Sequence, residues 1–240
     1  MSRRFIDLSM PVHNDMQTFP RLVRPSLEMW ETWEEFAHHI GAAEHGARWL
    51  TATYRIELSD HVGTHIDARR HVSDTAPGPE GIPLEYCFGN GVLFDFRDKP
   101  YGYGITVEDI NDRLCQMEYE LKPLDIVLIM TGAGAYQNEA RYLTDHCGMT
   151  ADATLWLIER GIKVMGIDAV TFDPPIWAMF ERRQFWESHL LMQEHEWFHI
   201  ENMTNLDNID RPFGFTVSVF PIQWVGTTAA PVRAVAILED

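Results

Sequence analysis

The sequence predicts a single domain of the α/β class. Its 240 residues fit one large domain, and a hydrophobic content of 45% is enough for a substantial core. The third indication is a strand–helix–strand pattern between residues 125 and 167. The apolar run 125–130 has the length of a strand that is covered on both faces. A helix and a second strand follow, and this order is typical of a right-handed parallel crossover.

Capping residues and turns define the flanking elements. Thr106 precedes a helical stripe and has Asp109 in a capping-box position, and Thr150 begins a helix that Gly161 ends. Residues 29–39 are expected to form a helix closed by a glycine. Residues 49–58 alternate between apolar and polar side chains, which predicts a half-buried strand.

The composition narrows the environment and the partners of the protein. A formal net charge of −17 argues against nucleic acid or an anionic membrane as a partner. The three cysteines are widely spaced, so neither a disulfide framework nor a cysteine zinc site is indicated. We find no export signal and no apolar run long enough to span a membrane. We therefore expect a soluble protein of the reducing cytoplasm.

The stretch between residues 60 and 71 carries the strongest chemical signal. It holds three histidines and two aspartates in twelve residues. Imidazole nitrogens and carboxylate oxygens are common ligands of catalytic divalent ions. In a strand, His65 and Asp67 would point the same way, roughly 7 Å apart. His61 would lie roughly 13 Å from His65 in a straight strand, so the chain must bend between them. Gly63 is where a bend costs least, and we expect His61, His65 and Asp67 to reach one ion.

Two further groups of histidines are less defined by spacing alone. His71 could be a ligand of a second ion, a general acid or base, or a bystander, and we favour the acid/base role. Near the C-terminus, His195 and His199 would share the face of a helix. Residues 197–202 alternate more like a strand, however, which leaves His189 and Glu201 as one plausible pair of ligands.

The motif His61-Val-Gly63-Thr64-His65-Ile-Asp67-Ala-Arg69-Arg-His71 resembles the signature H-x-G-T-H-x-D-x-P-x-H. This signature belongs to the cyclase-like metal-dependent hydrolases, which include bacterial kynurenine formamidase, isatin hydrolase and trans-dienelactone hydrolase. Other segments along nearly the whole chain also look like this family, including residues 82–85, 166–168 and 218–233.

The resemblance implies a fold, a metal centre and an assembly. The fold would be a mixed central β-sheet flanked by helices, in the swivelling β/β/α arrangement. His61, His65, Asp67, His189 and Glu201 would hold one or two divalent ions, Zn²⁺ or Mn²⁺, and His71 would be the acid/base. The family also implies a homodimer or homotetramer, with residues 1–25 as an arm at the interface.

Arg69 departs from the family signature, which has proline at this position. A guanidinium group can bind a carboxylate through two hydrogen bonds. Arg69 and Arg70 could therefore anchor a substrate carboxylate, or they could pair with internal acids such as Asp168 or Asp173. We also include Trp186 among the expected substrate-binding residues.

These observations together predict a hydrolase that acts on a small molecule. A metal-bound hydroxide would open a small cyclic ester or amide of the lactone or isatin type, and the arginines favour a carboxylated lactone. The alternatives are an arylformamidase that acts on N-formylkynurenine, and a metal-dependent cyclase or lyase without net hydrolysis. A binding protein with a structural ion is the weakest alternative, because structural sites are closed by protein ligands and are usually rich in cysteine.

Overall fold

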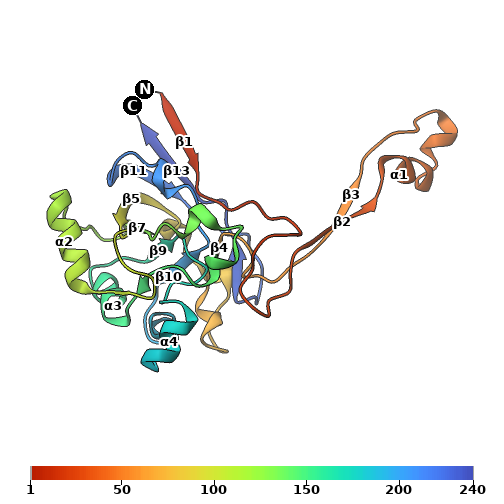
Figure 1. Cartoon of the computed structure of the whole chain (residues 1–240). Helices are drawn as coiled ribbons and strands as arrows, with labels where there is room; N and C mark the ends of the chain where they lie inside the picture. Colours follow the sequence, from red (N-terminus) through yellow and green to blue (C-terminus); the bar gives the residue numbers. More distant parts are fainter. Residues whose placement is uncertain (1, 240) are drawn as a thin grey trace.

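The computed structural model describes residues 2–239, and within them the chain forms a mixed nine-stranded sheet (Figure 1). In spatial order its strands are β1 (Arg3–Asp7), β13 (Val235–Glu239), β11 (Phe213–Ser218), β5 (Phe88–Asp95), β7 (Ile126–Met130), β9 (Val164–Ile167), β10 (Phe198–Glu201), β4 (His65–Asp67) and β12 (Ala229–Pro231). The four central strands from β5 to β10 are parallel, and antiparallel strands flank them on both sides. The predicted α/β class with a mixed sheet is confirmed.

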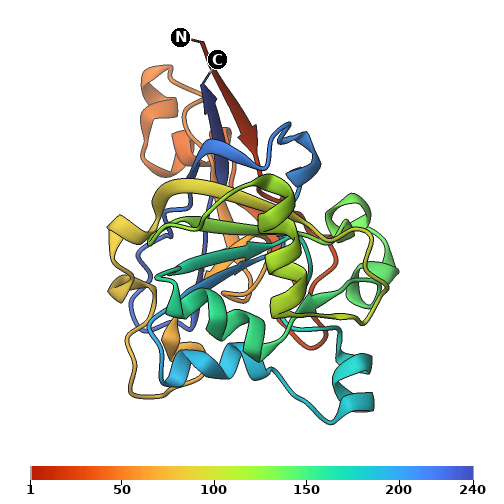
Figure 2. The same cartoon turned by 90° about the vertical axis from the view of Figure 1, so that its left-hand side faces the viewer.

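Helices cover one face of the parallel strands (Figure 2). They are α2 (Val107–Met117), α3 (Ala151–Glu159) and the short α5 (Glu187–Leu190), and a further helix, α4 (Ile176–Arg182), projects to the side of them. Thr106 and Asp109 form the predicted capping box of α2, and the Thr150 side chain accepts a hydrogen bond from the Ala153 amide at the start of α3. A small two-stranded sheet of β6 (Gly104–Ile105) and β8 (Gly148–Met149) precedes these helices.

The apolar strand β7 lies at the centre of two hydrophobic cores. Val127 and Ile129 pack in the core that includes α2 and α3, whereas Ile126 and Leu128 pack in a second core on the opposite face. Every residue of β7 is buried. The run 125–130 therefore behaves as its composition predicted, because successive side chains of a strand enter opposite cores.

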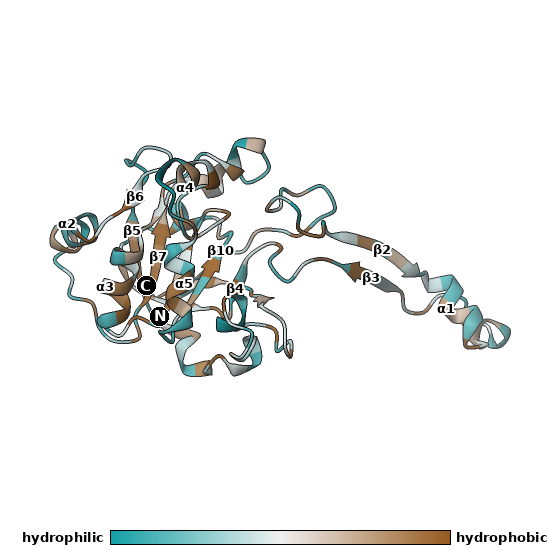
Figure 3. Cartoon of the chain, turned by 90° about the horizontal axis from the view of Figure 1, so that it is seen from below, coloured by the Kyte–Doolittle hydropathy of each residue, from teal (hydrophilic) through white to brown (hydrophobic). Residues whose placement is uncertain are grey.

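The segment between residues 26 and 57 projects from the body as an arm (Figures 1 and 3). It consists of β2 (Ser26–Glu31), α1 (Trp33–His39) and β3 (Thr53–Glu57), and β2 pairs with β3 in an antiparallel hairpin. The helix expected over residues 29–39 begins only after Thr32, which forms a capping box with Glu35. The preceding residues pair with β3 as a strand instead.

The expected burial of residues 49–58 is wrong for β3, whose five residues are all exposed. The alternation is present, but the strand lies in the arm, and none of its residues belongs to either hydrophobic core of the described residues. The projecting arm is a different segment from residues 1–25, whose expected place at an oligomer interface stays a prediction. Their first strand, β1, pairs with β13 in the main sheet, and Met10 and Met16 are buried in the core beside the helices.

Within residues 2–239, no helix is both long enough and apolar enough to cross a membrane.

Candidate metal centre

Two neighbouring strands carry four of the chemical groups of the centre. β4 lies between β10 and β12 and pairs antiparallel with both. The register sets Glu201 opposite His65 and His199 opposite Asp67. Residues directly opposite in an antiparallel pair point to the same face. The pairing therefore gathers two imidazoles and two carboxylates on one side of the sheet.

The predicted bend at Gly63 brings His61 to the same place. Gly63 has a φ of +70°, in the left-handed region that favours glycine, and a Cβ there would lie 2.7 Å from Val12 Cγ2. The Gly63 carbonyl accepts hydrogen bonds from His65 Nδ1 at 2.8 Å and from Asn202 Nδ2 at 3.0 Å. His61 itself lies in the turn before the glycine, not in a strand. The bend was predicted, but it belongs to a loop that leads into β4.

Three ligand atoms, from β4 and from the turn that leads into it, lie at the mutual distances that one ion requires. His61 Nδ1 is 3.2 Å from His65 Nε2, and both nitrogens lie 3.0–3.1 Å from Asp67 Oδ1. Ligands about 2.0–2.2 Å from a tetrahedral ion are roughly 3.4 Å apart. The predicted set of His61, His65 and Asp67 is thus brought together in the structure. Glu201 Oε2 lies 3.7 Å from His65 Nε2, beside this set.

Asp67 is a buried carboxylate whose oxygens have no hydrogen-bond partner among the described residues. Its side chain is 1% exposed, and among the described residues neither oxygen accepts a hydrogen bond. Burial by itself would raise the pKa of Asp67, but the surrounding imidazoles, first of all His61, hold this pKa well below its usual value. A buried, ionised and unbonded carboxylate among imidazoles is the donor chemistry that divalent ions take, so these residues fit a metal ion.

Partners behind the imidazoles orient their ring nitrogens. His61 Nε2 lies 2.8 Å from Thr228 Oγ1, whose hydroxyl donates to Asp60 Oδ2 at 2.7 Å. His189 Nδ1 donates to Asp173 Oδ2 at 2.6 Å. Such partners fix the tautomer, because the bonded nitrogen carries the proton and the other nitrogen remains free to bind an ion. Asp60, Asp173 and Thr228 are supporting residues that the sequence did not assign.

The second half of the cluster contains His189, Glu201 and His199, a residue whose role the sequence spacing did not decide. His189 Nε2 lies 3.2 Å from Glu201 Oε1. Burial tends to lower the pKa of His189, but the hydrogen bonds and negative charges of Asp173 and Glu201 together outweigh this effect and raise the pKa to about 10. Burial likewise tends to raise the pKa of Glu201, but the interactions with His189 and His199 together lower it overall. His199 is completely buried and also faces this group, at 3.3 Å from Asp67 Oδ2.

His71 stands at the edge of the cluster. Its Nε2 lies 3.7 Å from Asp67 Oδ2, and its side chain is 35% exposed, in contrast to the buried rings of His65 and His189. Burial lowers the pKa of His71 to about 4, against the effect of Asp67. The ring is therefore a neutral imidazole at neutral pH. It can accept a proton, which fits the predicted acid/base role.

A cavity of about 210 Å³ opens onto the cluster. Its lining includes His61, His71, His189 and Glu201 together with four apolar side chains, namely Phe19, Leu22, Val170 and Trp186. Trp186 has a φ of +51°, which is uncommon for a bulky residue, and its ring meets Phe19 edge-on at 6.2 Å. The structure thus places the predicted Trp186 at this cavity.

Arg69 and Arg70 bind backbone carbonyls and do not line the cavity at the metal centre. Arg69 donates to the carbonyls of Met192 and Gln193, at 2.8 and 3.0 Å, and Arg70 donates to carbonyls within its own loop. Among the described residues, neither forms a hydrogen bond or ion pair with Asp168 or Asp173, and neither lines the cavity. Arg69 instead ties the turn that carries His71 to the segment that follows His189.

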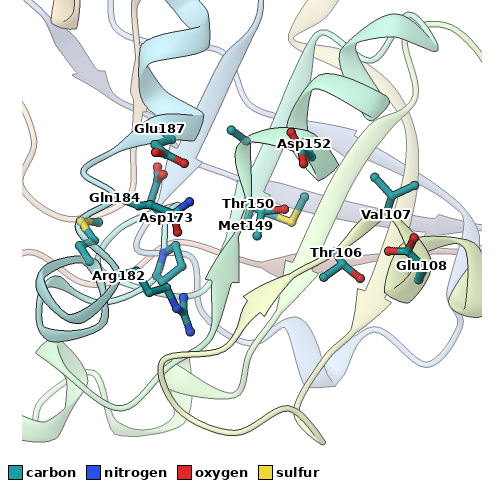
Figure 4. A pocket seen from close by; sticks show the side chains of 13 residues that line it. Thr106, Val107, Glu108, Met149, Thr150, Asp152, Asp173, Arg182, Gln184 and Glu187 are labelled. Carbon is teal, nitrogen blue, oxygen red and sulfur yellow. The ribbon is translucent and has the colours of Figure 1, made fainter.

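A larger hollow of about 370 Å³ is lined in part by Asp173, the carboxylate that accepts the hydrogen bond of His189 (Figure 4). Asp173 contributes to its lining, with Glu108, Asp152, Arg182 and Glu187 around it. None of the clustered imidazoles is among the described residues that line this hollow. The smaller cavity is therefore the one that adjoins the centre.

The chain resembles known proteins along nearly its whole length. Residues 6–174 match the family model of the putative cyclases. The chain is 24% identical over 233 residues to a kynurenine formamidase of Bacillus anthracis, covering 97% of this chain and 96% of the relative. It is 26% identical over 234 residues to that of Bordetella pertussis, with 97% of each chain covered.

Solved structures share the fold. An isatin hydrolase bound to the product analogue thioisatinate superposes with a TM-score of 0.85 at 15% identity, over 99% of this chain and 93% of the other. Isatin hydrolase A from Labrenzia aggregata, bound to benzyl benzoate, gives 0.82 at 22% identity, over 99% and 94%. The protein belongs to the cyclase family, as its signature indicated. Its relatives and its donor cluster identify it as a metal-dependent hydrolase.

The metal centre makes a direct prediction about His65. Replacing His65 with alanine should remove most of the bound divalent metal, because this ring lies at the middle of the closest ligand set. Elemental analysis of the purified variant measures this loss. His45→Ala, which changes an exposed histidine of the arm, is the matched control and should keep its metal. Equal metal content in the two variants would contradict the assignment.

Proposed function

We propose that the protein opens a small cyclic amide or ester of the isatin or lactone type by metal-dependent hydrolysis. The observation that carries this proposal is the joining of a divalent-ion ligand cluster to a small cavity with apolar walls. Zn²⁺ and Mn²⁺ both accept imidazole and carboxylate ligands and are the proposed ions. The fold shared with isatin hydrolases supports the cyclic substrate.

The cavity favours a flat, uncharged ring. Phe19, Leu22 and Trp186 provide apolar and aromatic contacts, and no lysine or arginine is among its described lining residues. A carboxylated lactone would need a cation at this point, since a desolvated carboxylate is costly unless it is paired. The contacts of Arg69 and Arg70 do not provide one. We therefore place an aromatic lactam or lactone ahead of a carboxylated lactone.

The chemistry divides between the ion and His71. A divalent ion supplies Lewis-acid activation of water and of the acyl group. The neutral ring of His71, which faces the cavity beside His61, takes the proton released by the attacking water. The same ring then returns this proton to the leaving nitrogen or oxygen, which completes the opening of the ring. Trp186 and Phe19 hold the ring of the substrate and keep bulk water away.

A formamidase is the second candidate, because kynurenine formamidases match nearly the whole chain. An aryl formamide presents the same flat ring and acyl carbon as a lactam. Hydrolysis assays on isatins, uncharged aromatic lactones, carboxylated lactones and N-formylkynurenine, with and without a chelator, distinguish these substrates. We expect chelator-sensitive ring opening, with ¹⁸O from labelled water in the product. Turnover without ¹⁸O incorporation would instead indicate a cyclase or lyase.

The role of His71 predicts a specific kinetic defect. His71→Ala should retain most of the metal but lose kcat by about 100- to 10,000-fold, the usual contribution of a general acid/base. Steady-state kinetics and metal analysis on the same preparation measure both effects. Arg70→Ala, at the neighbouring position, removes a side chain that donates to the carbonyls of Asp74 and Ala76 in its own loop, and it should keep its kcat. Unchanged turnover in His71→Ala would remove this residue from the mechanism.

We also propose that the chain forms a homodimer through its arm. On one face of the hairpin, Leu27 pairs with Ile56 and Met29 pairs with Tyr54. Ile56 and Tyr54 are 62% and 54% exposed. Isolated two-stranded hairpins are marginally stable, and contiguous exposed apolar surface marks an interface. A second copy could cover the face of each arm in an isologous contact.

The dimer is tested by Ile56→Asp. A charge on this face should convert the dimer to a monomer in sedimentation or light-scattering measurements, because it would be desolvated without a partner. Arg55→Ser changes the opposite face of the same strand and should leave the dimer intact. A wild-type protein that is monomeric at micromolar concentration would contradict the proposal.

A further inference from the structure

His199 is an additional imidazole in the centre that the family signature does not contain. It lies on β10 two residues before Glu201, so both side chains point to the same face of the strand. The ring is 0% exposed and is enclosed by the rings of Phe172 and Trp197, at centroid distances of 5.1 and 5.2 Å. Its Nδ1 has no hydrogen-bond partner among the described residues. All of its polar contacts in the described structure are therefore made by Nε2, with the ligand cluster.

The distances from His199 have the pattern of a second set of ligands. His199 Nε2 lies 3.2 Å from His189 Nε2, 3.3 Å from Asp67 Oδ2 and 3.4 Å from Glu201 Oε1. His189 Nε2 lies 3.2 Å from Glu201 Oε1 and 3.9 Å from Asp67 Oδ2. Four ligands around one tetrahedral ion are separated by roughly 3.4 Å. Asp67, His189 and His199 thus form a group whose ligand atoms all lie within 4.8 Å of one another, as one ion requires, and Glu201 Oε1 lies beside both of its imidazoles.

Each carboxylate divides its oxygens between the two sets. Asp67 directs Oδ1 toward His61 and His65 and Oδ2 toward His199. Glu201 directs Oε2 toward His65 and Oε1 toward His189 and His199. A hydrogen-bonded network explains this arrangement less well, because neither oxygen of Asp67 accepts a hydrogen bond in the described structure.

We propose that His199 is a ligand of a second divalent ion, which it binds together with His189, Asp67 and Glu201. The proposal rests on the metal-dependent function above and adds a specific ligand to it. It also separates the roles of two histidines. With His199 in the second ligand set, His71 is not required as a ligand and remains available in the cavity as the acid/base.

The test compares the metal content of three variants with that of the wild type. Each protein is stripped with a chelator, reloaded with Zn²⁺ alone, and analysed for ions per chain and for the affinity of the second equivalent by competition with a chromogenic chelator. We expect two ions in the wild type. His199→Ala should retain one ion, or bind the second at least about 100-fold more weakly, because it loses a direct ligand. His71→Ala should keep two ions.

His195→Ala is the matched control, because His195 lies four residues from His199 and outside both ligand sets, and it should also keep two ions. Two tightly bound ions in His199→Ala would overturn the proposal, as would loss of the second ion in His71→Ala alone. One ion in the wild type would overturn it while leaving the proposed function intact. A wild type that binds no Zn²⁺ would refute the proposed function as well.

A second measurement decides the matter if His199→Ala does not fold. Anomalous scattering from crystals of the Zn²⁺-loaded wild type locates each ion directly. An ion within about 2.0–2.2 Å of His199 Nε2 supports the proposal. Ions only beside His61 and His65, or a second ion bonded to His71 and not to His199, contradict it.

Discussion

The burial of Asp67 is the constraint on which the rest of the centre depends. Its carboxylate is ionised, almost fully enclosed and without hydrogen bonds in the described structure. An uncompensated buried charge costs several kcal/mol, so the fold must supply positive charge at this point. Protonated imidazoles and divalent cations can both do so, and they compete for the same nitrogen atoms. The imidazoles around Asp67 are the groups that place this positive charge beside the carboxylate.

Strand pairing, more than loop geometry, builds the cluster. β4 has only three residues, yet β10 and β12 hold it on both sides, so His65 and Asp67 are fixed by two hydrogen-bonded ladders. The same register brings Glu201 and His199 opposite them. Residues from mobile loops would leave the ligand distances loose, whereas a paired strand defines them. His71, the proposed acid/base, is by contrast on a short 3-10 turn, where it has room to exchange protons with a substrate.

Local spacing was sufficient to predict one half of the site and not the other. His65 and Asp67 are two residues apart, so a strand alone places them together, and the freedom of Gly63 explains how His61 reaches them. His199 and Glu201 repeat this two-residue spacing, which was a usable signal. The sequence could not show that β10 lies beside β4, because this pairing joins residues more than 130 positions apart.

The burial of the arm strand β3 was predicted wrongly for a related reason. Alternating side chains identify an apolar face of a strand, but they do not show what covers that face. Arg69 was judged by its charge, whereas in the structure its guanidinium holds two backbone carbonyls.

The most direct measurement of the link between Asp67 and a divalent ion is thermal unfolding of the chelator-treated protein during titration with Zn²⁺ or Mn²⁺. Binding to the native state alone stabilises it by about 4 kcal/mol when the free ion is at 1,000 times its dissociation constant. The Tm should therefore rise steadily with ion concentration, and Asp67→Asn should abolish this rise. A Tm that does not respond to chelator or to added ion would show that the carboxylate is balanced by protons alone, and that the cluster is not a metal centre.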